Sequence, residues 1–87
     1  MITGKTNSGF EFEIETERLD DWDLLESLTA VDKGNISVIP NVALALLGEE
    51  QLQRLKSHVK GIHGRVSMSA MFQEIFEILN SNNQGKN

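Results

Sequence analysis

The sequence predicts a small α+β domain, mainly helical, in which an N-terminal β-hairpin packs on a bundle of about four short helices. Three observations favour this class. Apolar and acidic residues alternate near the N-terminus, which is the period of a half-buried strand. From about residue 20 onward the apolar residues recur at the three- and four-residue spacing of a helix. The chain has 87 residues, which is the length of one domain with a modest core.

Two short strands are expected first. Residues 9–15 read GFEFEIE, so Phe10, Phe12 and Ile14 share one strand face and three glutamates share the other. Residues 2–5 are expected to pair with them, because Asn-Ser-Gly at positions 7–9 is typical of a tight turn. An isolated hairpin is marginal in water, so its apolar face should pack on the helices. We interpret the glutamates as a solvated face and not as paired catalytic carboxylates.

The first helix is expected to run from about residue 21 to Asp32. Asp20 or Asp21 can accept hydrogen bonds from its free N–H groups, and Asp23 adds negative charge to its first turn. Gly34 can take the positive φ that ends a helix. The apolar residues of its shared face are Leu24, Leu25, Leu28 and Val31, with Trp22 at the edge.

The densest apolar run is VIPNVALALL at residues 38–47, in which eight of the ten residues are apolar. Ser37 is the expected N-cap, Pro40 suits the first turn, and Gly48 should end this helix. Most of the run is expected to lie in the core. Leu44 points away from the broad apolar face at 100° per residue, so the end formed by Leu44 and Leu47 is predicted to face a partner.

Two further helices are expected. Residues 49–60 carry one narrow apolar stripe, and Gly61 and Gly64 frame the loop that follows. Ser67 should cap the last helix, whose wide arc of Met, Phe, Ile and Leu suits either the core or a partner surface. The single domain is placed at residues 1–79, and residues 80–87 are expected to form a polar flexible tail. The candidate partner-binding residues are Leu44, Leu47, Met68, Met71, Phe72, Ile75, Phe76 and Leu79.

The residue types point away from several functions. The chain has no cysteine, no glycine-rich phosphate loop and no HExxH or GxSxG motif. His58 and His63 lack a third ligand at metal-binding spacing, and no serine has the context of an acyl-carrier attachment site. A net charge of −5 and a last helix without Lys or Arg before position 79 disfavour nucleic-acid binding. We therefore expect a non-enzymatic interaction domain without metal or cofactor, in a soluble intracellular protein that does not enter a membrane.

The order of these features resembles a known family. The chain reads GFEFEI, then LDDWDLLESLTAVDKGN, then IPNVALALLGEEQLQRLKSHVK, then GRVSMSAMFQEIFEIL. It is similar to the small tail assembly chaperones of long-tailed bacteriophages and prophages of Gram-positive bacteria, over about residues 9–79. The residues that carry the resemblance are Asp20, Asp21, Trp22, Leu25 and Leu28, then Leu44, Leu47, Gly48, Glu49, Glu50 and Gln51, and then Gly64, Arg65 and Val66.

The resemblance implies a function during virion morphogenesis. Such chaperones bind the tape measure protein, keep it soluble and help to recruit tail tube subunits. They tend to self-associate, act in the cytoplasm of the bacterial host and are absent from the mature virion. A longer, frameshifted form is often made as well. The alternative is another helical module, such as a small phage adaptor or a dimerising regulatory protein.

Overall fold

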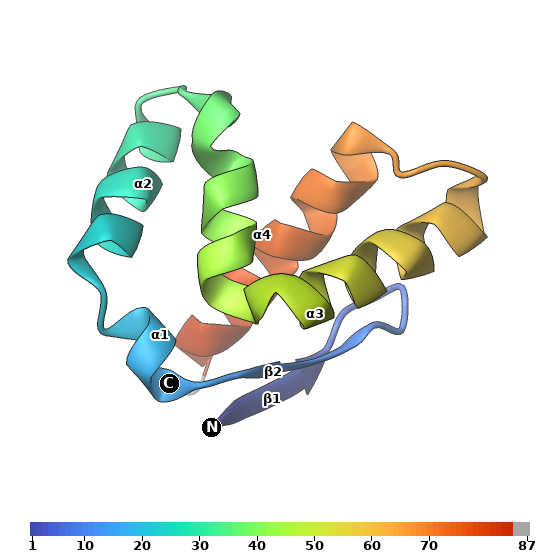
Figure 1. The fold of residues 1–87 in the computed structure, drawn as a ribbon, viewed down its shortest axis with the longest axis horizontal. Helices are drawn as coiled ribbons and strands as arrows, with labels where there is room; N and C mark the ends of the chain where they lie inside the picture. The colour runs from blue at the N-terminus through green and yellow to red at the C-terminus, as the bar shows by residue number, and fades with distance from the viewer. Residues whose placement is uncertain (85–87) are drawn as a thin grey trace.

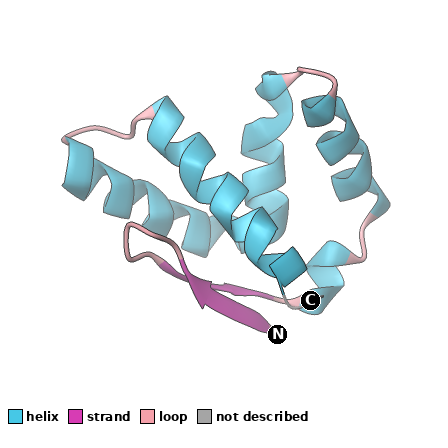
Figure 2. Cartoon of the chain, turned by 180° about the vertical axis from the view of Figure 1, so that it is seen from behind, coloured by secondary structure: helices cyan, strands magenta, loops and turns pink. Residues whose placement is uncertain are grey.

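The computed structural model describes residues 1–84 and has the predicted fold class (Figure 1). An antiparallel two-stranded hairpin lies beneath a set of helices that make up most of the chain (Figures 1 and 2). The elements are β1 (Ile2–Lys5), β2 (Glu11–Ile14), α1 (Thr16–Leu19), α2 (Trp22–Asp32), the 3₁₀ turn η1 (Ile36–Val38), α3 (Ile39–His63) and α4 (Met68–Gln84).

The hairpin follows from its alternating sequence. Ile2 pairs with Ile14 and Lys5 with Glu11, so the glutamates of β2 lie on the exposed face. Phe12 and Ile14 are buried on the other face, where β2 packs on α3. This side of the hairpin is therefore covered by helices, as the marginal stability of an isolated hairpin requires.

The centre of the fold is α3, which bends sharply at Gly48. Gly48 has φ 77° and ψ 165°, a backbone conformation that only glycine adopts readily. The first half of α3 stands beside α2, and the second half lies along the hairpin (Figure 1). The prediction that one helix ends at Gly48 and the next begins at Glu49 is confirmed by this break in the helical conformation. One glycine thus lets α3 contact the hairpin and every other helix.

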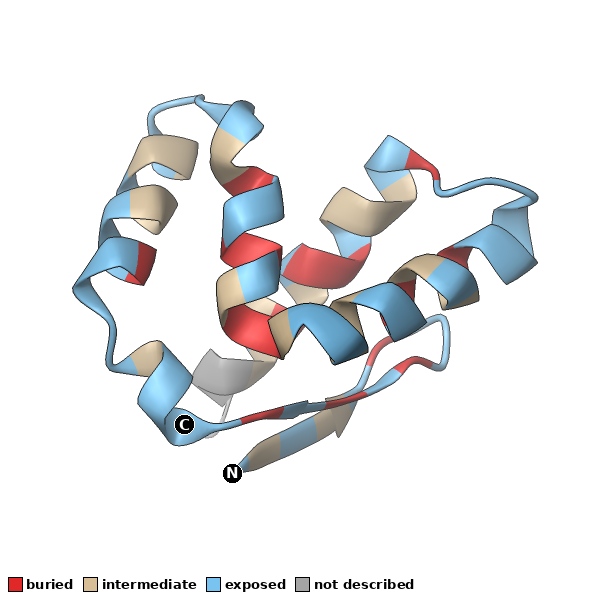
Figure 3. Cartoon of the chain, viewed as in Figure 1, coloured by how far each residue is buried: buried red, intermediate tan, exposed pale blue. Residues whose placement is uncertain are grey.

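The core lies where α3, α4, α2 and the apolar face of the hairpin meet (Figure 3). Leu46, Leu55 and Ile78 are completely buried there. The core members are Phe10, Phe12, Ile14, Leu24, Val42, Ala43, Leu46, Leu47, Leu55, Val59, Ile75 and Ile78.

Some local predictions were wrong. Ser37 does not cap α3: its N–H and hydroxyl both bond Asn35 Oδ1, at 3.3 and 2.6 Å, because residues 36–38 form a 3₁₀ turn. The short helix α1 was not predicted. Gly61 was expected to lie in a loop, but α3 continues through it, and the left-handed residue that ends the helix is Gly64, with φ 79°.

The last helix is longer than expected. It continues through Gln84, so the polar segment from residue 80 is helical over residues 80–84. Asn, Ser and Gln are weaker helix formers than Ala but do not break a helix, and the first glycine after this segment is Gly85. The remainder of the predicted tail, residues 85–87, lies outside the described residues.

Candidate functional site: a groove between α2 and α4

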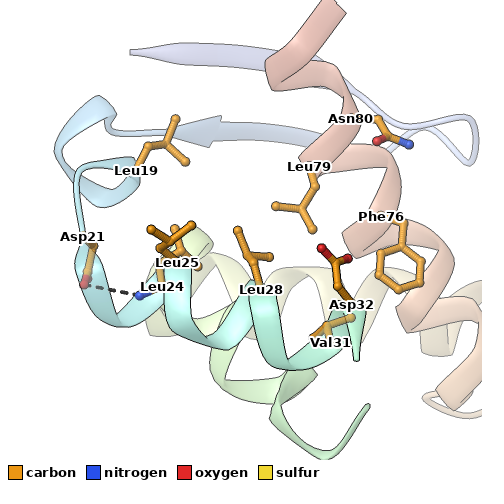
Figure 4. Close-up of a pocket in the computed structure, with 10 residues that line it drawn as sticks. All are labelled: Leu19, Asp21, Leu24, Leu25, Leu28, Val31, Asp32, Phe76, Leu79 and Asn80. Atoms are coloured by element: carbon orange, nitrogen blue, oxygen red, sulfur yellow. Dashed lines mark hydrogen bonds between the residues drawn. The ribbon is translucent and has the colours of Figure 1, made fainter. Parts of the chain in front are cut away.

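An open groove of about 480 Å³ separates α2 from α4 (Figure 4). The first half of α3 packs against α2, and α3 also packs against α4, which leaves a gap where α2 and α4 face each other. Leu19 of α1 closes one end (Figure 4). The lining residues are Leu19, Asp21, Leu24, Leu25, Leu28, Val31, Asp32, Phe76, Leu79 and Asn80.

One wall of the groove is the apolar stripe of α2. Only Leu24 is buried in this helix, at 4% exposed, because α3 covers just one edge of the stripe. Leu25 is 52% exposed, and Leu28 and Val31 are half-buried. The sequence correctly placed these four residues on one side of a helix, but that side is shared between the core and the groove.

The opposite wall belongs to α4. Ile75 and Ile78 point into the core, while Leu79 is half-buried and Phe76 is 41% exposed on the groove side. Phe72 stacks on Phe76 with ring centroids 6.4 Å apart. At helical spacing Phe72 and then Met68 continue the same stripe beyond the groove.

The structure separates the eight candidate partner-binding residues into three groups. Phe76 and Leu79 line the groove. Leu47 and Ile75 are buried in the core, at 4% and 1% exposed, so this conformation does not offer either to a partner. Four others lie outside the groove lining: Leu44 and Met68 are exposed, and Met71 and Phe72 are half-buried.

The expectation of an exposed Leu44–Leu47 end is therefore right for Leu44 and wrong for Leu47. Leu44 is 45% exposed, whereas Leu47 packs in the core. The buried positions of this half of α3 include Ile39, Val42, Ala43, Leu46 and Leu47. These positions recur at the three- and four-residue spacing of one helix face, which includes Leu47 and excludes Leu44.

The charged groups in the lining are two aspartates of α2. Asp21 Oδ1 accepts the N–H of Asp23 at 2.9 Å and that of Leu24 at 3.4 Å, which caps the helix. The Asp32 side chain forms no hydrogen bond or ion pair with any residue in the described part of the chain. Figure 4 shows the two carboxylates at opposite ends of the row of leucines.

A polar network fastens the opposite side of α4, and we call it the hairpin clasp: Asn7, Ser8, His58, Glu74 and Glu77. The hydroxyl of Ser8 donates to Glu74 Oε2 at 2.8 Å and lies 2.9 Å from His58 Nε2. The backbone N–H of Asn7 donates to Glu77 Oε1 at 2.8 Å. The turn of the hairpin is thereby bound to both α3 and α4.

The clasp does not have the geometry of a catalytic triad. In a catalytic triad the histidine accepts the proton of the serine hydroxyl, whereas here the Ser8 hydroxyl donates to Glu74 Oε2 and lies 2.9 Å from His58 Nε2. Glu74 is 5% exposed, and its Oε1 has no partner within residues 1–84. The N–H of Asn7, and then the side-chain amide of Gln73, lower the pKa of Glu77. These contacts hold the hairpin in place.

No three His, Asp or Glu side chains within residues 1–84 gather closely enough to hold a metal ion. Over the same residues, no helix is long and apolar enough to cross a membrane. Comparison of the chain with protein-family models, with curated protein sequences and with solved structures found no match.

Proposed function

We propose that this protein is a tail assembly chaperone of a long-tailed bacteriophage or prophage. In this proposal it binds the tape measure protein in the bacterial cytoplasm, keeps it soluble and helps to recruit tail tube subunits. It acts by binding and not as an enzyme. The observation that carries the proposal is the open apolar groove between α2 and α4, together with the family resemblance of residues 9–79.

The groove suits a protein that holds long amphipathic helices. Its walls are two helices whose exposed leucines and phenylalanine can receive the apolar face of a third helix. Phe72 and Met68 extend the α4 wall, and methionine adapts its shape to varied side chains. The same residues would otherwise leave apolar surface in water, which is typical of an interaction site.

The acidic character of the chain supports the same function. A net charge of −5 keeps a protein with exposed apolar residues dispersed. Hydrophobic contact would supply the affinity, and the charge would keep the complex in solution.

Co-expression with the tape measure protein of the same gene cluster tests the proposal. We expect the wild-type protein to bring the tape measure protein into the soluble fraction and to copurify with it. Leu25→Glu places a charge in the groove at a residue that is 52% exposed, and should leave the tape measure protein in the pellet. Ile62→Glu, at a residue 53% exposed on α3 and outside the groove, is the matched control.

Circular dichroism of the two variants should show wild-type helix content, because both sites are half exposed. If the wild-type protein neither solubilises nor retains the tape measure protein, the proposal is wrong. Purified virions separate the chaperone from the adaptor that is the alternative. A chaperone is absent from them, and detection of this chain in finished tails would support the adaptor.

A further inference from the structure

We propose that the α2–α4 groove recognises an amphipathic helix that carries a Lys or Arg at each end of a three-turn apolar stripe. The two cations would pair with Asp21 and Asp32. This inference rests on the proposed function, because it specifies which helices of a partner the groove accepts. Its test uses isolated peptides, so that it can fail independently of the tape measure experiment.

The spacing of the two aspartates defines the length of the occupant. Asp21 and Asp32 are eleven residues apart, which is about three turns of α2 and about 16 Å along its axis. Both residues line the groove, Asp21 as the N-cap of α2 and Asp32 as its last residue. A helix lying along α2 would therefore need its cations about eleven positions apart.

The chemistry of the lining selects a helix over an extended segment. The walls are helices whose backbone groups are already paired, and the lining offers no sheet edge. An extended chain would lose water from its N–H and C=O groups there and gain no partners for them. A helix pairs its own backbone groups and needs only an apolar face, which Leu25, Leu28 and Phe76 can cover.

Charge argues against a second copy of the chain as the occupant. The cations on α3 are Arg54, Lys56 and Lys60, which span only seven residues. The apolar residues between them, Leu55 and Val59, are buried in the core. No helix among residues 1–84 thus presents an exposed apolar stripe with a cation at each end. The complementary partner is therefore a different protein with basic, amphipathic helices.

The two carboxylates are free to make these contacts. Asp21 uses Oδ1 for the helix cap, which leaves Oδ2 for a partner. Asp32 has no partner among the residues described. Asn is an equally good helix cap, so Asp21→Asn removes the charge and keeps α2 intact. The double variant Asp21→Asn/Asp32→Asn therefore changes the charge of the groove without changing its apolar walls.

Two synthetic 18-residue helical peptides without tryptophan test the inference. Both peptides carry the same leucine stripe. One peptide has Lys at each of two positions eleven residues apart, and the other peptide has Glu at both of these positions. Binding is followed by the fluorescence of Trp22, the single tryptophan of the chain, which is the first residue of α2 and follows Asp21 in the sequence. We expect the wild-type protein to bind the Lys peptide at least about tenfold more tightly than the Glu peptide.

The expected effect of Asp21→Asn/Asp32→Asn is to reduce this preference to about twofold or less. The control Asp20→Asn/Asp23→Asn removes the same charge outside the groove lining and should keep most of the preference. Equal binding of the two peptides to the wild-type protein would overturn the inference. An equal loss in both double variants would overturn it too, because net charge alone would then explain the preference. The inference would also be overturned if the emission of Trp22 changed with protein concentration but not on addition of either peptide. A second copy of the chain would then occupy the groove.

Discussion

The two sides of α4 show how the same helix can be fastened on one side and left open on the other. On the hairpin side, Glu74 and Glu77 hold the turn of the hairpin through hydrogen bonds of 2.8 Å. On the α2 side, Phe76 and Leu79 face a groove. The contrast indicates which side is structural and which is available for binding. A surface held by several hydrogen bonds resists exchange of partners, whereas an uncovered apolar surface favours it.

The largest effect is expected from a comparison of two substitutions in α4, at Ile78 and at Phe76, which are two positions apart. Ile78→Ala should lower the free energy of unfolding by about 2–5 kcal/mol, because Ile78 is completely buried. Phe76→Ala should cost about 1 kcal/mol or less, since Phe76 is 41% exposed and loses few contacts. Urea denaturation followed by circular dichroism measures both. Equal losses would mean that the groove side is part of the core.

The next effect tests the hairpin clasp. Ser8→Ala should lower the free energy of unfolding by about 1–3 kcal/mol, because it leaves the buried carboxylate of Glu74 without its hydrogen-bond donor. Ser69→Ala is the control: Ser69 is exposed, and the one hydrogen-bond partner of its hydroxyl among the described residues is Ser67 Oγ, at 3.2 Å. If both variants unfold at the same urea concentration, the clasp contributes nothing to stability.

A smaller effect concerns pH. Because Glu77 has a lowered pKa in the folded protein, its contribution to stability is complete above the usual value of 4.5 and is lost as the pH falls through the folded value. The Glu77→Gln variant should therefore lose less stability than the wild-type protein when the pH falls. Urea midpoints of the two proteins between pH 6 and about pH 3 measure this. Parallel curves for the wild type and Glu77→Gln would contradict it.

The smallest expected effect on stability is that of Leu44→Glu. Leu44 is 45% exposed and lies outside the groove lining, so the free energy of unfolding should change by about 0.5 kcal/mol or less. Light scattering should show weaker self-association if this residue lies in a contact between copies. If the variant unfolds, Leu44 belongs to the core. If light scattering gives the same mass for the variant and the wild type, the contact between copies involves other residues.

Much of the fold could be predicted because its signals are local. The alternation of Phe10, Phe12 and Ile14 with glutamates gives the hairpin, and Asp21 and Ser67 mark helix starts where the structure has them. Gly48 marks the break in α3. Errors of a few residues arose where a local preference was weak, as at Ser37 and after Asn80.

The groove and the clasp could not be predicted in the same way. The apolar stripes of α2 and α4 look like core faces in sequence, and only the path of α3 decides that they stay apart. The clasp joins Ser8 to His58 and Glu74 across 50 and 66 residues. No local pattern encodes such pairs. Leu47 was misplaced because it was grouped with Leu44, whereas the spacing of the buried residues of α3 puts it on the core face.

Hydrogen–deuterium exchange of the protein, alone and in a complex with the tape measure protein, tests whether the groove is the binding site. We expect the amides of α2 and of residues 72–80 to become protected in the complex, while those of the hairpin keep their exchange rates. Protection confined to the hairpin or to the second half of α3, with α2 unchanged, would contradict the assignment of the groove as the binding site.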